Sequence, residues 1–246
     1  KPFNQLSLEQ IASLDVGRIN PASRYARDFQ SQTPQDGERI PTLASVFEHV
    51  KRLGAGHVRF NIELKTHPRR PDESPDPEAF VRAVMAVINS RGMASRSTLQ
   101  SFDWRVLKAG QAVAPGMPLS FLSAQLDRFN TLSDGDWTSG LKLADFEDAP
   151  AMVAAAGGKL WSPHFNDLSQ ATLARARSFN LRVIPWTVNE IIWGFDQDAN
   201  NNVYAAVRRV TEETVHGVVK YDANMQLVAE SLTEYYSDVD VAPDGK

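Results

Sequence analysis

Apolar residues in the first 190 positions follow two alternating periods, one helical and one typical of short strands. Helical spacing is expected at 43–53, 76–91, 104–113, 150–156 and about 168–179. Strand-like apolar runs lie at 57–65, 98–102, 118–122, 160–164 and 181–188. Strands that alternate with helices in this way predict parallel β/α units in which helices cover both faces of the sheet.

Turn and capping residues mark the ends of several of these segments. Gly54 ends the first helical pattern, Asp76-Pro77 opens the second and Gly92 stops it. Residues 1–40 are polar by comparison, and Ser7-Leu-Glu-Gln10 fits a helix capping box within them.

The polar residues at the ends of the predicted strands favour a barrel over an open sheet. Neither a G-x-G-x-x-G loop nor a Walker A loop is present in the sequence. Polar side chains instead follow separate strands, where barrel enzymes place catalytic groups: Glu63, Lys65, Gln100, Ser101, His164 and Asn189. A complete (β/α)8 TIM barrel takes at least ~200 residues, whereas these five units end near residue 189. We therefore expect an α/β fold of the (β/α)8 type that is incomplete, with the first two or so βα units absent.

The pattern of apolar and polar residues changes after Asn189. Segments 193–198 and 217–222 alternate like strands with polar turns, and residues 238–245 end the chain in a similar pattern. The expected organisation is a partial barrel domain at 1–189 and a β-rich segment at 190–246.

Composition and charge exclude several classes of protein. The chain has 246 residues, 26 Lys and Arg against 30 Asp and Glu, a net charge of -4 and no cysteine. These values argue against disorder, a disulfide scaffold and a thiolate zinc site. The scattered basic residues lack the footprint of a non-specific nucleic-acid binder. No apolar run approaches the ~20 residues of a membrane span.

The segment Asn61-Ile-Glu-Leu-Lys65 is the first candidate for chemistry. Alternation in a strand places Asn61, Glu63 and Lys65 on one face, which would look into a barrel. Glu63 could give an oxygen ligand to Ca2+ or Mg2+ while Lys65 meets an anionic substrate. Two alternatives remain open: a simple Glu63–Lys65 ion pair at a solvated strand edge, and an aldolase-like barrel in which Lys65 forms a Schiff base.

Further candidates lie at the ends of later strands. Gln100 could bind substrate, although such a turn also serves to cap the next helix, with Asp103 as the cap. The indole of Trp186 could pack on substrate or belong to the core. His67 and His164 are the two local candidates for acid/base work, because each follows the end of a strand.

Several ordered segments resemble the glycerophosphodiester phosphodiesterase family. They are Ile40-Pro-Thr-Leu43, Asn61-Ile-Glu-Leu-Lys65, Gln100-Ser-Phe-Asp-Trp104, Trp161-Ser-Pro-His164 and Val183-Ile-Pro-Trp-Thr-Val-Asn189. The resemblance implies a TIM barrel that hydrolyses small-molecule glycerophosphodiesters to glycerol 3-phosphate and an alcohol with Ca2+ or Mg2+. It also implies that Glu63 binds the metal, that Lys65 contacts the phosphate, and that Gln100 and Trp186 line the substrate pocket.

The sequence also departs from the family pattern. The family's His-Arg-Gly strand, its Glu-x-Asp metal pair and its second histidine are expected before residue 1, so the chain resembles a fragment that is inactive by itself. The closing strand is matched weakly by 217–222, and 190–246 resembles β-propeller repeats. The alternative function is therefore an inactive fragment with a propeller-like binding module. The segments at 15–18 and 68–77 resemble periplasmic or secreted bacterial members, and that location is expected.

Overall fold

The computed structural model describes residues 2–186, 191–197, 203–210, 214–221 and 227–231. The chain divides into two compact units, which are described separately. The first contains residues 1–120 and 134–140, and the second contains residues 121–133 and 141–246. Segment 134–140 therefore belongs to the first unit although its neighbours in sequence belong to the second.

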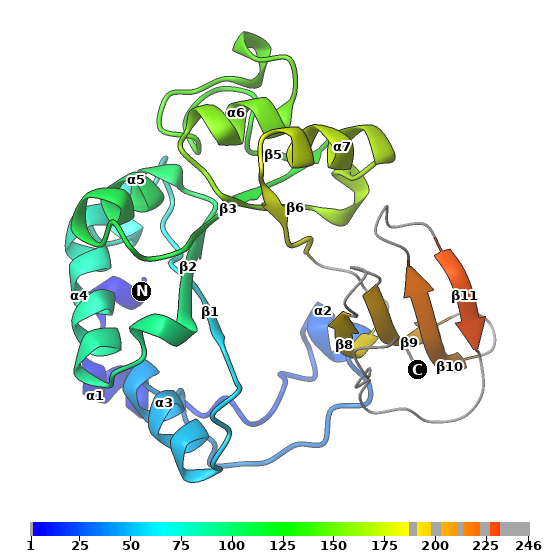
Figure 1. Ribbon diagram of the computed structural model, residues 1–246. Helices are drawn as coiled ribbons and strands as arrows, with labels where there is room; N and C mark the ends of the chain where they lie inside the picture. Colours follow the sequence, from blue (N-terminus) through cyan, green and yellow to red (C-terminus); the bar gives the residue numbers. More distant parts are fainter. Residues whose placement is uncertain (1, 187–190, 198–202, 211–213, 222–226, 232–246) are drawn as a thin grey trace. The chain divides into compact units, whose positions relative to one another are not determined.

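The first unit combines two parallel strands with helices (Figure 1). Its elements are α1 (Leu8–Ala12), α2 (Arg24–Asp28), α3 (Leu43–Arg52), β1 (Phe60–Glu63), α4 (Pro77–Ser90), β2 (Ser97–Ser101) and α5 (Trp104–Val113). Strands β1 and β2 pair in parallel, with Phe60 opposite Ser97 and Glu63 opposite Gln100. Helix α5 packs on β2 and on α4, and α4 contacts α3.

Capping residues begin these helices as the sequence predicts. Ser7 and Gln10 form a capping box at α1, since each side chain accepts the other residue's backbone N–H. Asp76 accepts the N–H of Ala79 at the start of α4, and Pro77 occupies its first position. The first unit's core includes Phe47, Leu64, Val81, Ile88, Leu99, Trp104 and Leu107, all of which are buried.

The second unit contains the later strands. Its elements are β4 (Gln125–Leu126), β5 (Phe129–Asn130), α6 (Ala149–Ala155), β6 (Leu160–Pro163), α7 (Gln170–Ser178), β7 (Arg182–Val183), β8 (Ile191–Gln197), β9 (Val203–Val210), β10 (Thr214–Tyr221) and β11 (Leu227–Ser231). Strands β6 and β7 pair in parallel. Its core includes Phe121, Leu132, Met152, Val153 and Trp161.

Strand β3 (Leu119–Ser123) is where the chain passes from one unit to the other, and the strand order of the parallel sheet is β1-β2-β3-β6-β7. The α/β fold with a parallel sheet is therefore confirmed. Barrel closure and the missing first units stay predictions.

The last parallel strand is shorter than the sequence predicts. The apolar run suggests 181–188, but β7 covers two residues and Trp186 adds an isolated bridge to His164. Hydrogen bonds to β6 nevertheless continue past β7, because the N–H groups of Ile184 and Trp186 donate to the Trp161 and Pro163 carbonyls at 2.9 and 3.0 Å. Asn189 lies outside the described residues.

Strands β8 to β11 form a separate antiparallel sheet in the order β11-β10-β9-β8. The residues at the proposed boundary, 187–190, lie outside the described ones. The division at 189/190 and the propeller-like character of the later segment stay predictions.

Candidate active site

The carboxyl end of β1 presents an ion pair to solvent. Glu63 Oε1 lies 2.6 Å from Lys65 Nζ, and the Lys65 side chain is 77% exposed while that of Glu63 is 23% exposed. The pair matches the ion-pair alternative that the sequence leaves open. An exposed pair of this kind contributes about 0–1 kcal/mol, so either group can take another partner at small cost.

Gln100 stands beside this pair at the end of β2. It is the register partner of Glu63, and its Oε1 accepts a hydrogen bond of 2.7 Å from Asn61 Nδ2. Three of the four predicted site residues, Glu63, Lys65 and Gln100, therefore share one edge of the first unit.

The turn after Gln100 has a structural role, as the capping alternative predicts. Ser101 Oγ donates to the Leu64 carbonyl at 2.7 Å and accepts the N–H of Asp103. Asp103 is fully buried and caps α5 by accepting the N–H of Arg105. It also accepts hydrogen bonds from the Arg105 guanidinium and from Thr66 Oγ1 at 2.8 Å, so it ties the segment after β1 to α5.

The segment after Lys65 is held by the loop of residues 134–140. Arg69 Nε donates to Asp136 Oδ2 at 2.6 Å, and Arg69 Nη2 pairs with Asp134. The ring of His67 lies 4.9 Å from that of Trp137. No pattern in the sequence predicts these contacts, since Arg69 lies 67 and 65 residues from its partners and the three follow no periodic spacing.

Trp186 lies in the second unit with its indole N–H already bound. Nε1 donates to the carbonyls of Ser162 at 3.0 Å and Ser123 at 3.2 Å. Its ring meets that of His164 edge-on, with centroids 4.9 Å apart. The indole N–H is therefore engaged within the second unit.

His164 has a carboxyl group nearby in the same unit. Its Nδ1 accepts the N–H of Asn166 at 3.2 Å, so the neutral ring carries its proton on Nε2. Burial raises the pKa of Asp167, and this effect outweighs the Gln125 N–H and the His164 charge, which lower it. Asp167 thus holds its proton to higher pH than an ordinary aspartate does.

The expected metal ligands can be compared with the described residues. Among them, no group of three or more His, Asp or Glu side chains is placed to hold a cation. Ca2+ takes 6–8 oxygen ligands, whereas the end of β1 offers the Glu63 carboxylate and, on β2, the Gln100 amide. These groups by themselves do not make a complete site.

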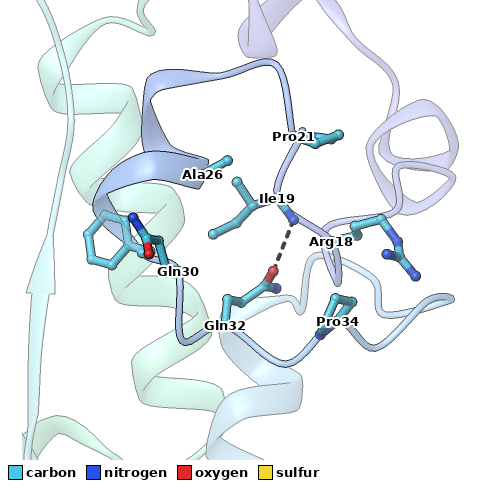
Figure 2. A pocket seen from close by; sticks show the side chains of 8 residues that line it. Arg18, Ile19, Pro21, Ala26, Gln30, Gln32 and Pro34 are labelled. Atoms are coloured by element: carbon cyan, nitrogen blue, oxygen red, sulfur yellow. Dashed lines mark hydrogen bonds between the residues drawn. The ribbon is translucent and has the colours of Figure 1, made fainter.

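A shallow pocket of about 210 Å3 lies in the N-terminal segment instead (Figure 2). It is lined by Arg18, Ile19, Pro21, Ala26, Phe29, Gln30, Gln32 and Pro34, and the N–H of Ile19 donates to Gln32 Oε1 at 3.2 Å. None of the predicted site residues lines this pocket, and Arg18 is paired with Asp36.

A sequence profile of the glycerophosphoryl diester phosphodiesterase family matches residues 1–222. The chain belongs to this family. The family match continues past residue 189 and ends at segment 217–222, which weakly resembles the family's closing strand. No curated protein matches the chain.

Solved structures agree with this family membership. A Silicibacter pomeroyi protein assigned as a glycerophosphoryl diester phosphodiesterase is 30% identical, with a TM-score of 0.63, and the match covers 75% of this chain and 58% of that protein. A Galdieria sulphuraria protein assigned as a glycerophosphodiester phosphodiesterase is 18% identical, with a TM-score of 0.50, covering 74% of this chain and 57% of that one. The second likeness concerns the fold alone. The chain thus spans less than two thirds of either relative.

No helix within the described ranges is both long and apolar enough to cross a bilayer.

Proposed function

We propose that the protein hydrolyses glycerophosphodiesters to glycerol 3-phosphate and an alcohol. The observation that carries the proposal is the family match over residues 1–222, together with Glu63, Lys65 and Gln100 at one edge of the first unit. An ammonium beside amide groups suits a phosphodiester, whose oxygens gain negative charge during displacement.

Lys65 is the proposed phosphate-binding group. Its ammonium is exposed, and its ion pair with Glu63 contributes little free energy. A phosphate oxygen can therefore replace the Glu63 carboxylate as the partner of Lys65. Gln100, oriented by Asn61 at 2.7 Å, is proposed to bind a substrate oxygen, and the Trp186 ring is proposed to pack on an apolar part of the substrate.

A divalent cation, Ca2+ or Mg2+, is part of the proposal. When bound, it would neutralise charge on the phosphate, and Glu63 would supply one of its oxygen ligands. We also propose, from the resemblance to the family, that the 246-residue chain by itself does not turn over substrate.

The Schiff-base alternative for Lys65 fits the structure less well. A lysine that forms a Schiff base is activated by desolvation or by a neighbouring cation, whereas Lys65 is 77% exposed and pairs with an anion. A propeller-like binding module at 190–246 and a periplasmic or secreted location stay proposals that rest on resemblance.

The test of this proposal is kinetics on the full-length protein with glycerophosphocholine. Glu63→Gln keeps the shape of the side chain and removes its charge, so we expect lower metal affinity and at least about 100-fold lower kcat. Glu78→Gln, in an exposed pair with Arg82 on α4, is the matched control. Unchanged metal affinity and turnover in Glu63→Gln would show that the assignment of Glu63 is wrong.

A further inference from the structure

Loop 134–140 belongs to the first unit, whereas the residues before and after it in the sequence belong to the second. Gly135 and Gly140 have φ values of +89° and +96°, and the N–H of Gly140 donates to the Gly135 carbonyl at 2.8 Å. Positive φ favours glycine at both positions. The Trp137 carbonyl accepts the N–H of Trp104, the first residue of α5, at 2.7 Å. The loop is therefore a closed turn fixed to the start of a core helix.

This turn contacts the chain immediately after Lys65 through two side chains. Arg69 lies between Asp134 and Asp136 and bonds to both. The His67 ring packs against Trp137, and the N–H of Arg69 donates to His67 Nδ1 at 3.2 Å. The neutral His67 ring therefore keeps its proton on Nε2.

Two other contacts hold the same segment at positions closer to Lys65. The N–H of His67 donates to Ser74 Oγ at 3.1 Å, and Thr66 Oγ1 donates to Asp103. Lys65, by contrast, is exposed and has Glu63 as its ion-pair partner.

The position of the Lys65 ammonium therefore depends on the backbone on both sides of it. Leu64, before it, is hydrogen-bonded to the Gln100 carbonyl and to Ser101 Oγ. The segment after it is held by Thr66 and by Arg69, whose side chain is 52% exposed but engages two carboxylates.

We infer that Arg69 and Trp137 are positioning residues, which clasp loop 134–140 to the end of β1 and so set the place of Lys65 and His67 toward substrate. The inference rests on the proposed function, because it assigns Lys65 to the substrate phosphate. It adds a distant loop to the determinants of that site. Arg69 acts through a planar fork that engages two carboxylates, a geometry that lysine does not reproduce.

The kinetic test is a double-mutant cycle in the full-length protein with glycerophosphocholine. Arg69→Ala is expected to lower kcat/KM about 10-fold to 100-fold, since small misplacements of a binding group have effects of that order. Arg69→Lys should restore part of this loss. In a Lys65→Ala background, Arg69→Ala should cost less than about 2-fold, because the group it positions is already gone. Equal losses in both backgrounds would overturn the inference.

A second measurement tests the clasp without turnover. Hydrogen exchange of the amides at 64–70 should accelerate in Arg69→Ala and in Trp137→Ala, while Trp137→Phe retains a ring and much of the protection. Arg82→Ala, which removes an exposed ion pair on α4, is the matched control and should leave these amides unchanged. If the wild type fails to release glycerol 3-phosphate, the proposed function is wrong. Hydrogen exchange of the amides at 64–70 then still tests whether Arg69 and Trp137 hold this segment. Unchanged exchange in Arg69→Ala contradicts the inference in either case.

Discussion

Replacing Asp103 with alanine should destabilise the protein more than any exposed charge does. The Asp103 carboxylate is 0% exposed, caps α5 and accepts hydrogen bonds from Arg105 and Thr66. Loss of a cap costs about 1 kcal/mol, and a Thr66 hydroxyl without its acceptor costs about 1 kcal/mol more. Arg105 is 38% exposed, so water can solvate its guanidinium in the variant, and losing its ion pair with Asp103 costs about 1 kcal/mol.

These terms together predict a loss of about 3 kcal/mol, which lowers Tm by roughly 6–12 °C in a protein of this size. Urea unfolding measured by circular dichroism gives the free energy, and the slope against urea checks that the unfolded state is unchanged. Asp148→Ala is the matched control: Asp148 caps α6 and pairs with Arg175 but is 21% exposed. We expect about 1–2 kcal/mol for it. A loss below about 1 kcal/mol for Asp103→Ala, or an equal loss in both variants, would refute the reasoning from burial.

Two further predictions concern packing and pH. An alanine Cβ at Gly158 would lie 2.6 Å from Val153 Cγ1, so Gly158→Ala should cost about 1–3 kcal/mol in urea unfolding. Gly116→Ala meets no atom within 4 Å and should be near neutral; similar costs at both sites would contradict the packing argument. Hydrogen bonds from backbone N–H groups, first that of Gly37, lower the pKa of Asp15 below 3.8 in the folded protein. The contribution of Asp15 to the free energy of unfolding is therefore complete above pH 3.8, and it is lost as the pH falls through the pKa of the folded state. Asp15→Asn should flatten the acid side of the stability profile, and an unchanged profile would show that these bonds are not formed.

Much of the local structure is predictable from the sequence because it depends on near neighbours. Asp76-Pro77 sets the start of α4, and the expected helix at 104–113 is α5 residue for residue. The apolar run at 181–188 is regular strand only at Arg182–Val183, although Ile184 and Trp186 still donate hydrogen bonds to β6, a detail that periodicity alone does not contain.

The site is predictable in part, and the limit is physical. Strand alternation predicts Glu63 and Lys65 on one face, and the two are paired although β1 ends at Glu63; parallel pairing brings Gln100 beside Glu63. The clasp between Arg69 and Asp136 is invisible in the sequence, since closing it depends on how a 67-residue interval folds. Whether Glu63 binds a metal or only pairs with Lys65 likewise depends on further metal ligands, and the spacing of residues around Glu63 does not reveal them.

The measurement that tests the central claim most directly is identification of the product released from glycerophosphocholine by the full-length protein. An enzyme-coupled assay specific for glycerol 3-phosphate should detect turnover that EDTA abolishes and that added Ca2+ or Mg2+ restores. Lys65→Ala should lower kcat/KM by at least about 100-fold, because it removes the proposed phosphate contact. Release of choline phosphate in place of glycerol 3-phosphate, or full activity in Lys65→Ala, would contradict the account.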